Sequence, residues 1–368
     1  MMKLKRIILL CVILPLLFGC GGKKITHDLP APPTPTKPTD PSGGEGGEGG
    51  GGDEGGNTTT PGEWEKNRGK VVTPSGTGWT KTTVREGITY YAFSGTDPIT
   101  KVAQNVCAID VDLSKDQYAV KLAYSAPAAT TSAVHAKYNA IATMNAGYEA
   151  GSIYIRIDGR DKSSLPNTQI GTTGVPNWKS EAGFFCDGER NLSIKKAETL
   201  IRPYISPSSD QMSAYITSQR NFYFKCPDKY VISSSPMLID DFQPVGETFI
   251  DYSIGNWSKL NTEEAQYHQR HRHPRSAVAL TENKHFIMMV VDGRQSKFAE
   301  GMSAKELTQF FVANFNPQYA LNMDGGGSTA MCVEGLGNAS THVVDVPIND
   351  NKKGNERARD THFIIVAK

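Results

Sequence analysis

The stretch Asn322-Met323-Asp324-Gly325-Gly326-Gly327-Ser328-Thr329-Ala330-Met331 carries the strongest indication of how the chain folds. A short apolar strand, Ala320–Met323, runs into a carboxylate and three consecutive glycines, and a second apolar run follows. Because glycine loses the most conformational freedom on folding, three in a row indicate a sharp turn or a close approach of the backbone to a ligand. Backbone N–H groups freed in such a turn can bind an anion, and the carboxylate beside them can do acid/base work. A plain hairpin turn is the alternative.

Two other apolar strands end in polar residues in the same way. Met144 leads to Asn145, and Val291 leads to Asp292 and Arg294. The segments His273-Pro274-Arg275 and Glu356-Arg357 add further polar residues upstream and downstream of these strands. Polar groups at strand ends are how a fold builds a site on a rigid base, so we expect these side chains to meet.

This set of residue types favours an anionic substrate that carboxylates cleave. The planar guanidinium of arginine matches a phosphate with two parallel hydrogen bonds, and paired carboxylates serve as acid, base or nucleophile in glycoside cleavage. The alternative is that Asp292 and Arg294 merely cap a turn and pair at the surface.

The rest of the domain has mostly strand patterns. Strands are predicted at Val106–Leu113, Tyr118–Tyr124, Ile141–Met144, Ser276–Leu280, His285–Val291 and His362–Val366, and a hairpin at Trp79–Tyr91. Ser132 is the expected N-cap of a short helix through Tyr138, and the capping box Ser303-Ala304-Lys305-Glu306 opens a helix through Phe315. Residues 151–230 are rich in Ser, Pro and Asn and are predicted to be irregular. This order predicts an α+β domain with a mixed β-sheet and few helices.

The N-terminus has the pattern of a targeting segment. Three basic residues precede the apolar run Ile7–Leu17, which is short for a membrane span. The run ends in Leu17-Phe18-Gly19-Cys20, which resembles the bacterial lipobox; an ordinary signal peptide is the alternative. We therefore expect residues 1–20 to be a lipoprotein signal peptide and Cys20 to carry a lipid anchor, with the globular part outside the cytoplasm. Gly21 after the cysteine favours the outer membrane or cell surface, by analogy.

Residues 21–63 form a predicted linker, proline- and threonine-rich at first and then rich in Gly and Glu. The motif Gly44-Glu45-Gly46-Gly47-Glu48-Gly49 matches the dinucleotide fingerprint literally, but no strand precedes it and no helix follows. Residues 64–368 remain as the globular domain. The net charge of +1 comes from mixed charges, so the composition indicates no attraction to nucleic acid.

Three further signals concern thiols, metals and serine chemistry. The domain has four cysteines, Cys107, Cys186, Cys226 and Cys332. An even count permits two disulfides in an oxidising compartment, and four free buried thiols are the alternative. The run His268–His273 is His-rich, but its interleaved arginines disfavour a metal. No G-x-S-x-G motif is present, so Ser328 is expected to orient Asp324 or to contact a phosphate.

Taken together, several segments resemble the phosphodiester glycosidase family over about residues 100–368. The resemblance rests on 144–148, 235–239, 273–277, 291–294, 301–303 with its helix, 322–328 and 356–357, in the family order. It implies that Asn145, Arg275, Asp292, Arg294, Asp324, Gly326, Gly327 and Ser328 line the site. The chain departs from the family pattern at Ser233–Ser235, at Glu149 and at Ala358-Arg359, which bears on the substrate more than on the fold.

The resemblance implies a glycosidase that hydrolyses the C1–O bond of a sugar-1-phosphodiester to free sugar and a phosphate monoester. Arg275 and Arg294 would neutralise the departing phosphate, and Asp324 or Asp292 would stabilise the oxocarbenium-like centre or activate water. The expected substrate-binding residues are Asn145, Gly325, Gly326, Gly327, Ser328, Glu356 and Arg357. No cofactor is expected.

Two rival functions stay open at the level of sequence. One is a phosphodiesterase that cleaves P–O with a metal held by Asp292, Asp324 and His273. The other is a surface glycan-binding lipoprotein without turnover.

Overall fold

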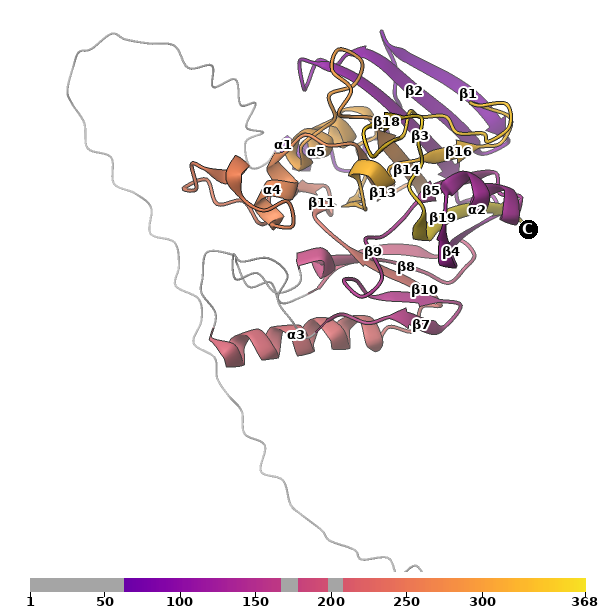
Figure 1. The fold of residues 1–368 in the computed structure, drawn as a ribbon. Helices are drawn as coiled ribbons and strands as arrows, with labels where there is room; N and C mark the ends of the chain where they lie inside the picture. The colour runs from indigo at the N-terminus through magenta and orange to yellow at the C-terminus, as the bar shows by residue number, and fades with distance from the viewer. Residues whose placement is uncertain (1–62, 167–177, 198–207) are drawn as a thin grey trace, which may run out of the picture. The chain divides into compact units, whose positions relative to one another are not determined.

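The computed structural model describes residues 63–166, 178–197 and 208–368, and Figure 1 shows their fold. The predicted signal peptide, Cys20 and nearly all of the predicted linker lie outside the described residues. Within the described ranges, no helix is long and apolar enough to cross a bilayer.

The largest sheet has eight strands. Their spatial order is β1 (Trp79–Arg85), β2 (Ile88–Thr96), β3 (Ala103–Asp112), β14 (His285–Val291), β13 (Arg275–Leu280), β15 (Tyr319–Asn322), β11 (Met237–Asp240) and β12 (Gln243–Pro244). Successive side chains of a strand point to opposite faces. In β3, accordingly, Cys107 and Ile109 join one hydrophobic cluster, whereas Val106 and Ala108 join another. Both faces of this sheet are therefore covered.

Two smaller sheets pack on one of these faces. The first has four strands, β16 (Met331–Val333), β5 (Ala142–Asn145), β19 (Arg359–Ala367) and β4 (Tyr118–Ala129). The second has five, β7 (Arg160–Ser163), β6 (Ile155–Ile157), β10 (Tyr230–Ser234), β8 (Ala182–Cys186) and β9 (Leu192–Lys196). Met144, Phe363 and Phe184 from these sheets share one buried cluster with Ile109 and Met288 of the large sheet. A hairpin of β17 (Ile348–Asn349) and β18 (Lys352–Lys353) stands apart from the three sheets.

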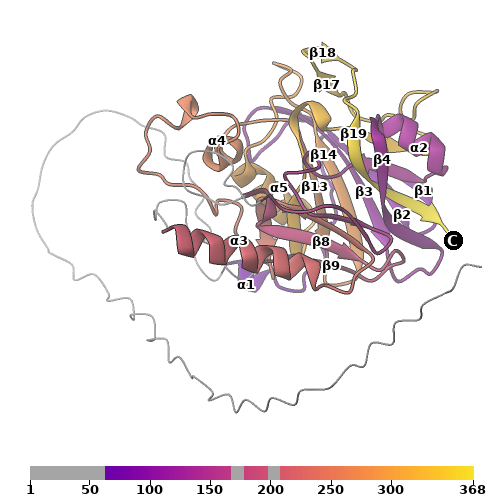
Figure 2. The same ribbon diagram turned by 60° about the horizontal axis from the view of Figure 1, so that its bottom comes forward.

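Helices cover the outer faces of this assembly (Figures 1 and 2). They are α1 (Glu63–Lys66), α2 (Thr131–Tyr138), α3 (Ser209–Phe224), α4 (Ala265–Arg270) and α5 (Ala304–Asn314), with 3-10 turns η1 (Trp178–Ser180), η2 (Trp257–Lys259) and η3 (Gly326–Ser328). α5 packs Leu307 and Phe310 on the second face of the eight-stranded sheet. α3 stacks Tyr223 on Phe185 of β8 and so covers the five-stranded sheet.

The predicted α+β class with few helices is confirmed, and the ladders between the named strands are antiparallel. The predicted strands Ser276–Leu280 and His285–Val291 form as β13 and β14, which pair with each other. The capping box of α5 forms as predicted: the Ser303 hydroxyl accepts the Glu306 N–H at 3.3 Å, and the Glu306 carboxylate accepts the Ser303 N–H at 2.9 Å.

Two predictions of local structure are wrong. Residues 151–230 are not simply irregular, because they hold four short strands, the start of β10 and α3. Those strands have three to five residues each, too few for a periodic pattern to stand out. The N-cap of α2 is Thr130, whose hydroxyl accepts the Ala133 N–H at 3.3 Å, and Ser132 lies inside the helix.

Candidate functional site

Three neighbouring strands of the eight-stranded sheet meet at one edge, as the polar strand ends predict. β13 lies between β14 and β15. In antiparallel order the end of β14, the start of β13 and the end of β15 fall at the same edge. Arg275 at the start of β13 pairs with Val291 at the end of β14. Asp292 and Asp324, which follow β14 and β15, therefore leave the sheet on either side of Arg275.

The glycine bend is tied to both of its neighbours. The Gly326 N–H donates to the Pro274 carbonyl at 2.8 Å, just before β13. The Asp324 N–H donates to the Ala146 carbonyl at 3.0 Å, just after β5 of the four-stranded sheet. Asp324 thus sits where two sheets meet.

The buried amide of Asn145 fixes this junction. Its Nδ2 donates to the Asp324 carbonyl at 2.7 Å. Its Oδ1 accepts from the Ser276 hydroxyl at 2.7 Å and from the Ala330 N–H at 3.2 Å. The side chain is fully buried. Asn145, predicted to bind substrate, therefore has its donor and acceptor groups engaged within the protein and joins the two sheets.

The backbone of the bend offers fewer free donors than the sequence predicts. The N–H groups of Gly326 and Ser328 donate to Pro274 and Gly325, so the prediction that all N–H groups from 325 to 328 face an anion is wrong for these two. The N–H groups of Gly325 and Gly327 form no hydrogen bond within the described residues. Gly326 has φ of +62°, a left-handed conformation that favours glycine.

Two exposed arginines lie over the bend. A Cβ placed on Gly326 would lie 3.1 Å from Nη2 of Arg294, and one on Gly327 would lie 2.5 Å from Nη2 of Arg357. Partial burial and then the positive charge of Arg357 lower the pKa of Arg294, so the two cations are near each other. In the described ranges, the arginine–carboxylate ion pairs all involve other arginines. Two guanidinium groups without a carboxylate partner can grip an anion above the bend.

Neutral groups hold these two arginines in place. Nε of Arg357 donates to Oδ1 of Asn349 at 2.8 Å. Nη2 of Arg294 lies 3.3 Å from Nδ1 of His273. Burial, together with the charges of Arg275 and Arg294, lowers the pKa of His273, so its ring is neutral at physiological pH and can accept from the guanidinium. The positive charges of the two arginines therefore stay uncompensated.

Asp324 pairs with an arginine that the sequence did not single out as a site residue. Nε of Arg359 lies 3.1 Å from Oδ2 of Asp324, close enough for an ion pair although outside standard hydrogen-bond geometry. Burial raises the pKa of the Asp324 carboxyl, and the charge of Arg359 opposes this rise. The neighbouring Ser328 also lowers the Asp324 pKa, although its buried hydroxyl forms no hydrogen bond of standard geometry among the described residues.

Asp292 faces inward. It is 2% exposed, and its carboxylate accepts from Nδ2 of Asn105 at 2.7 Å and from the Val346 N–H at 3.1 Å. Burial raises its pKa to about 6. Burial and the charge of Asp292 also raise the pKa of Asp345, another carboxyl that the sequence did not single out. The negative charge of one carboxylate therefore disfavours ionisation of the other.

Arg275 is a structural clamp in this structure. It is 1% exposed, its Nε donates to the Met302 carbonyl at 2.8 Å, and its Nη2 donates to the carbonyls of His268 and His271 at 2.6 and 2.9 Å. Burial lowers its pKa to about 10. The guanidinium holds the loops around the site and is not open to solvent.

Glu356 points to the start of α2. Its carboxylate accepts from the Ser132 N–H at 2.9 Å and from the Ser132 hydroxyl at 2.5 Å. A carboxylate at a helix N-terminus satisfies unpaired N–H groups and complements the helix dipole. Its neighbour Arg357 lies over Gly327. Of the two predicted substrate-binding residues Glu356 and Arg357, only Arg357 therefore lies at the bend.

The histidines of the run 268–273 stack beside the bend. The rings of His271 and His273 lie 4.6 Å apart, and His268 contacts Tyr148 at 3.2 Å. In the part of the chain that the structure describes, no three His, Cys, Asp or Glu side chains gather as a metal site requires. All four cysteines of the domain are free thiols.

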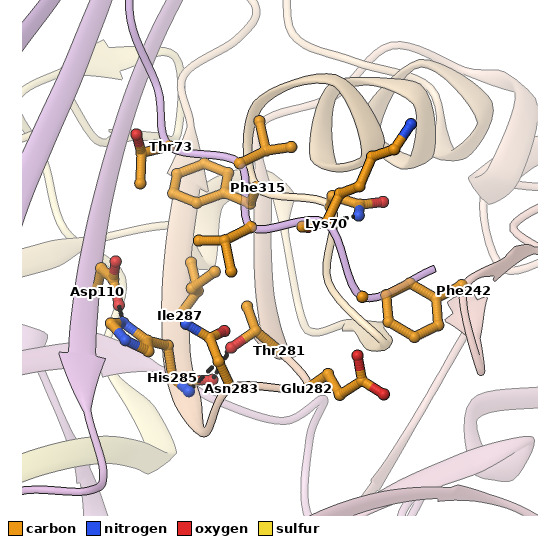
Figure 3. Close-up of a pocket in the computed structure, with 14 residues that line it drawn as sticks. Lys70, Thr73, Asp110, Phe242, Thr281, Glu282, Asn283, His285, Ile287 and Phe315 are labelled. Atoms are coloured by element: carbon orange, nitrogen blue, oxygen red, sulfur yellow. Dashed lines mark hydrogen bonds and ion pairs between the residues drawn. The ribbon is translucent and has the colours of Figure 1, made fainter. Parts of the chain in front are cut away.

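A hollow of about 220 Å³ lies at the opposite edge of the eight-stranded sheet (Figure 3). It is lined by the segment 69–73, the turn 281–283, and Asp110 and His285, whose side chains pair at 2.7 Å. His285 begins β14 and Asp292 follows its end, so the hollow and the bend are about 20 Å apart at about 3.3 Å per residue. The hollow is therefore separate from the predicted site.

Comparison with known proteins defines the class. Residues 139–366 match the model of the phosphodiester glycosidase family, which is more than half of the chain. The chain therefore belongs to this family. No curated protein matches the sequence.

Three solved structures are similar. A protein of Burkholderia pseudomallei has 11% identity and a TM-score of 0.51, with 81% of this chain and 99% of that chain covered; it shows the same fold. The catalytic domain of zebrafish N-acetylglucosamine-1-phosphodiester alpha-N-acetylglucosaminidase, auto-inhibited by its pro-peptide, has 15% identity and a TM-score of 0.48, with 81% and 87% covered. A protein of Synechocystis has 12% identity and a TM-score of 0.49, with 79% covered; the match spans 64% of its length.

Proposed function

We propose that the protein hydrolyses the C1–O bond of a sugar-1-phosphodiester, releasing free sugar and a phosphate monoester. Membership of the phosphodiester glycosidase family supports the reaction class. The observation that carries the proposal is the pair Arg294 and Arg357, which lie over a side-chain-free bend next to the carboxylate of Asp324. This arrangement suits a substrate whose scissile bond joins an anion to a carbon that becomes positively charged.

The phosphate would sit above Gly326 and Gly327. There the two guanidinium groups can each donate to its oxygens, and the N–H groups of Gly325 and Gly327 can add further donors. As C1–O breaks, both bonding electrons leave with the phosphate oxygen. Preorganised cations at that position stabilise the charge as it develops, which lowers the barrier.

Asp324 would act at the sugar carbon. Its carboxylate lies at the start of the bend and can stabilise an oxocarbenium-like centre or take a proton from the attacking water. The water oxygen then bonds to C1. In this scheme Asp292 holds the segment at Val346, Asn145 joins the sheets, and Arg275 clamps the loops, so each of the three supports the site without touching the sugar.

The test is a panel of sugar-1-phosphodiesters scored for free sugar. We expect at least one to be hydrolysed by the full chain. Asp324→Asn should lower turnover by about 10²- to 10⁴-fold, as loss of an acid/base group does, in a protein that still folds. The matched control is Asp116→Asn, which removes an exposed carboxylate paired with Lys368 and should keep full activity.

Either of two results would contradict the proposal. One is wild-type turnover by Asp324→Asn. The other is tight binding of sugar phosphates by the wild type with no product after long incubation, which would indicate a glycan-binding protein.

A further inference from the structure

Arg359 is the first residue of β19 and forms an ion pair with Asp324. β19 pairs regularly with β4 from Thr361 onward, whereas Arg359 pairs with Ala129 beyond an irregular stretch of β4. In this ion pair the Arg359 side chain is 13% exposed and the Asp324 side chain is 14% exposed. Both charges are thus largely shielded from water.

We propose that Arg359 is a positioning residue that keeps the buried carboxylate of Asp324 ionised and holds it through one oxygen. The inference rests on the proposed function only in naming the reaction that Asp324 serves. The ion pair engages Oδ2, and within the described residues Oδ1 accepts no hydrogen bond of standard geometry, although the Ser328 hydroxyl lies near the carboxylate. Oδ1 is therefore the oxygen left for the reacting carbon or the attacking water.

The other charged groups around Asp324 cannot replace Arg359. Lys179 on η1 lies 2.9 Å from a carboxylate oxygen of Glu149 and 3.0 Å from one of Glu263, so its charge is already shared. Glu149, in the loop after β5, opposes ionisation of Asp324. Ser328 on η3 and Tyr148 beside β5 complete the polar groups that face the carboxylate, and both are uncharged at neutral pH.

Removal of the Arg359 charge has a direct consequence. An unpaired carboxylate out of water takes up a proton, because burial favours its neutral form. A larger share of Asp324 would then be protonated at a given pH, and the protonated form could neither stabilise a cation nor accept a proton. The loss would appear at low pH first.

The experiment compares Arg359→Gln with Arg359→Lys in the full chain. Since an adjacent opposite charge lowers a carboxyl pKa by about one to three units, we expect the acidic limb of the kcat/KM profile to move up by about that amount in Arg359→Gln. Arg359→Lys keeps the charge, so its acidic limb should lie close to that of the wild type. Arg85→Gln breaks an exposed ion pair with Glu334 and is the matched control with an unchanged profile.

A second measurement does not depend on activity. The Asp324 carboxyl carbon can be titrated by ¹³C NMR, assigned by its absence in Asp324→Asn, with melting temperatures to confirm folding. We expect the Asp324 pKa to be higher in Arg359→Gln than in the wild type, and to be close to the wild-type value in Arg359→Lys. An unchanged pKa, or equal shifts in both variants, would overturn the inference while leaving the proposed function standing. A wild type that releases no sugar would overturn the proposed function, yet the titration would still decide the role of Arg359.

Discussion

Arginine has two opposite uses around the bend. Arg275 is buried and donates to backbone carbonyls, so its donors are consumed by the fold. Arg294 and Arg357 are exposed, and each touches one neutral side chain. A charge-assisted bond to phosphate is stronger than a neutral hydrogen bond, so a substrate anion can displace these weak contacts. Neutralising the leaving group therefore falls to Arg294 and Arg357.

The glycines of the bend allow a test of this division. In Gly327→Ala the new Cβ would meet the Arg357 guanidinium at 2.5 Å and Asn349 Oδ1 at 3.0 Å. The flexible arginine can move away, so we expect little loss of stability. Its displacement should raise KM by about tenfold or more, as loss of a charged hydrogen bond worth about 1.5–3 kcal/mol does. Steady-state kinetics and urea unfolding measure the two effects.

Gly335→Ala is the matched control. Gly335 has φ of +71° and no atom within 4 Å of a Cβ position. An alanine there should cost about 1–2 kcal/mol through backbone strain and leave KM unchanged. If Gly327→Ala instead lost stability and kept a wild-type KM, Arg357 would have no part in binding.

At the level of elements, the start of α5 supports the backbone that binds the Arg275 guanidinium. Its capping box begins at Ser303, directly after Met302, whose carbonyl accepts Nε of Arg275. The Glu306 carboxylate of the same capping box also accepts hydrogen bonds from Nε and Nη2 of Arg272. The start of one helix therefore supports the segment on which the site histidines lie.

Loss of this cap should lower stability without touching chemistry. We expect Ser303→Ala to cost about 1 kcal/mol, because the Glu306 N–H loses its partner. The measurement is the urea midpoint at constant m-value. Ser94→Ala, at an exposed position in β2, should change stability by less than about 0.5 kcal/mol. Equal stabilities of the two variants would mean that the cap contributes nothing.

The helices and strands that the sequence predicted correctly are those with strong local sequence patterns. The capping box at Ser303 and the two apolar runs on either side of the turn 281–284 indicate their own conformation. The strands between residues 151 and 197 have no such signal, because β8 is a five-residue buried run and its neighbours are shorter or equal. The two hairpins β6–β7 and β8–β9 join into one sheet only through β10, more than 30 residues along the chain from β9.

At the level of the whole molecule, the site exists only where two sheets meet. Asp324 follows the eight-stranded sheet, whereas its partner Arg359 opens β19 of the four-stranded sheet. The sequence could predict the strand ends and the bend, since each is a local pattern. Arg359 stands two residues after Arg357, a spacing that places side chains on one side of an extended chain. That spacing was a usable signal, but the contact of Arg359 with Asp324 depends on how the four-stranded sheet meets the eight-stranded sheet.

Asn349 and Asp345 had no usable signal. They lie between β16 and β19, Asn349 at the end of β17, and only the folded position of that segment brings them to Arg357 and Asp292. Their part in the site is a property of the tertiary structure alone.

The most direct test of the account is the position of bond cleavage. A sugar-1-phosphodiester that the protein cleaves is hydrolysed in H₂¹⁸O. Mass spectrometry of both products then shows which atom the water attacks. Cleavage of C1–O predicts ¹⁸O on C1 of the released sugar and none in the phosphate monoester. Label in the phosphate would mean P–O cleavage and would rule out a glycosidase.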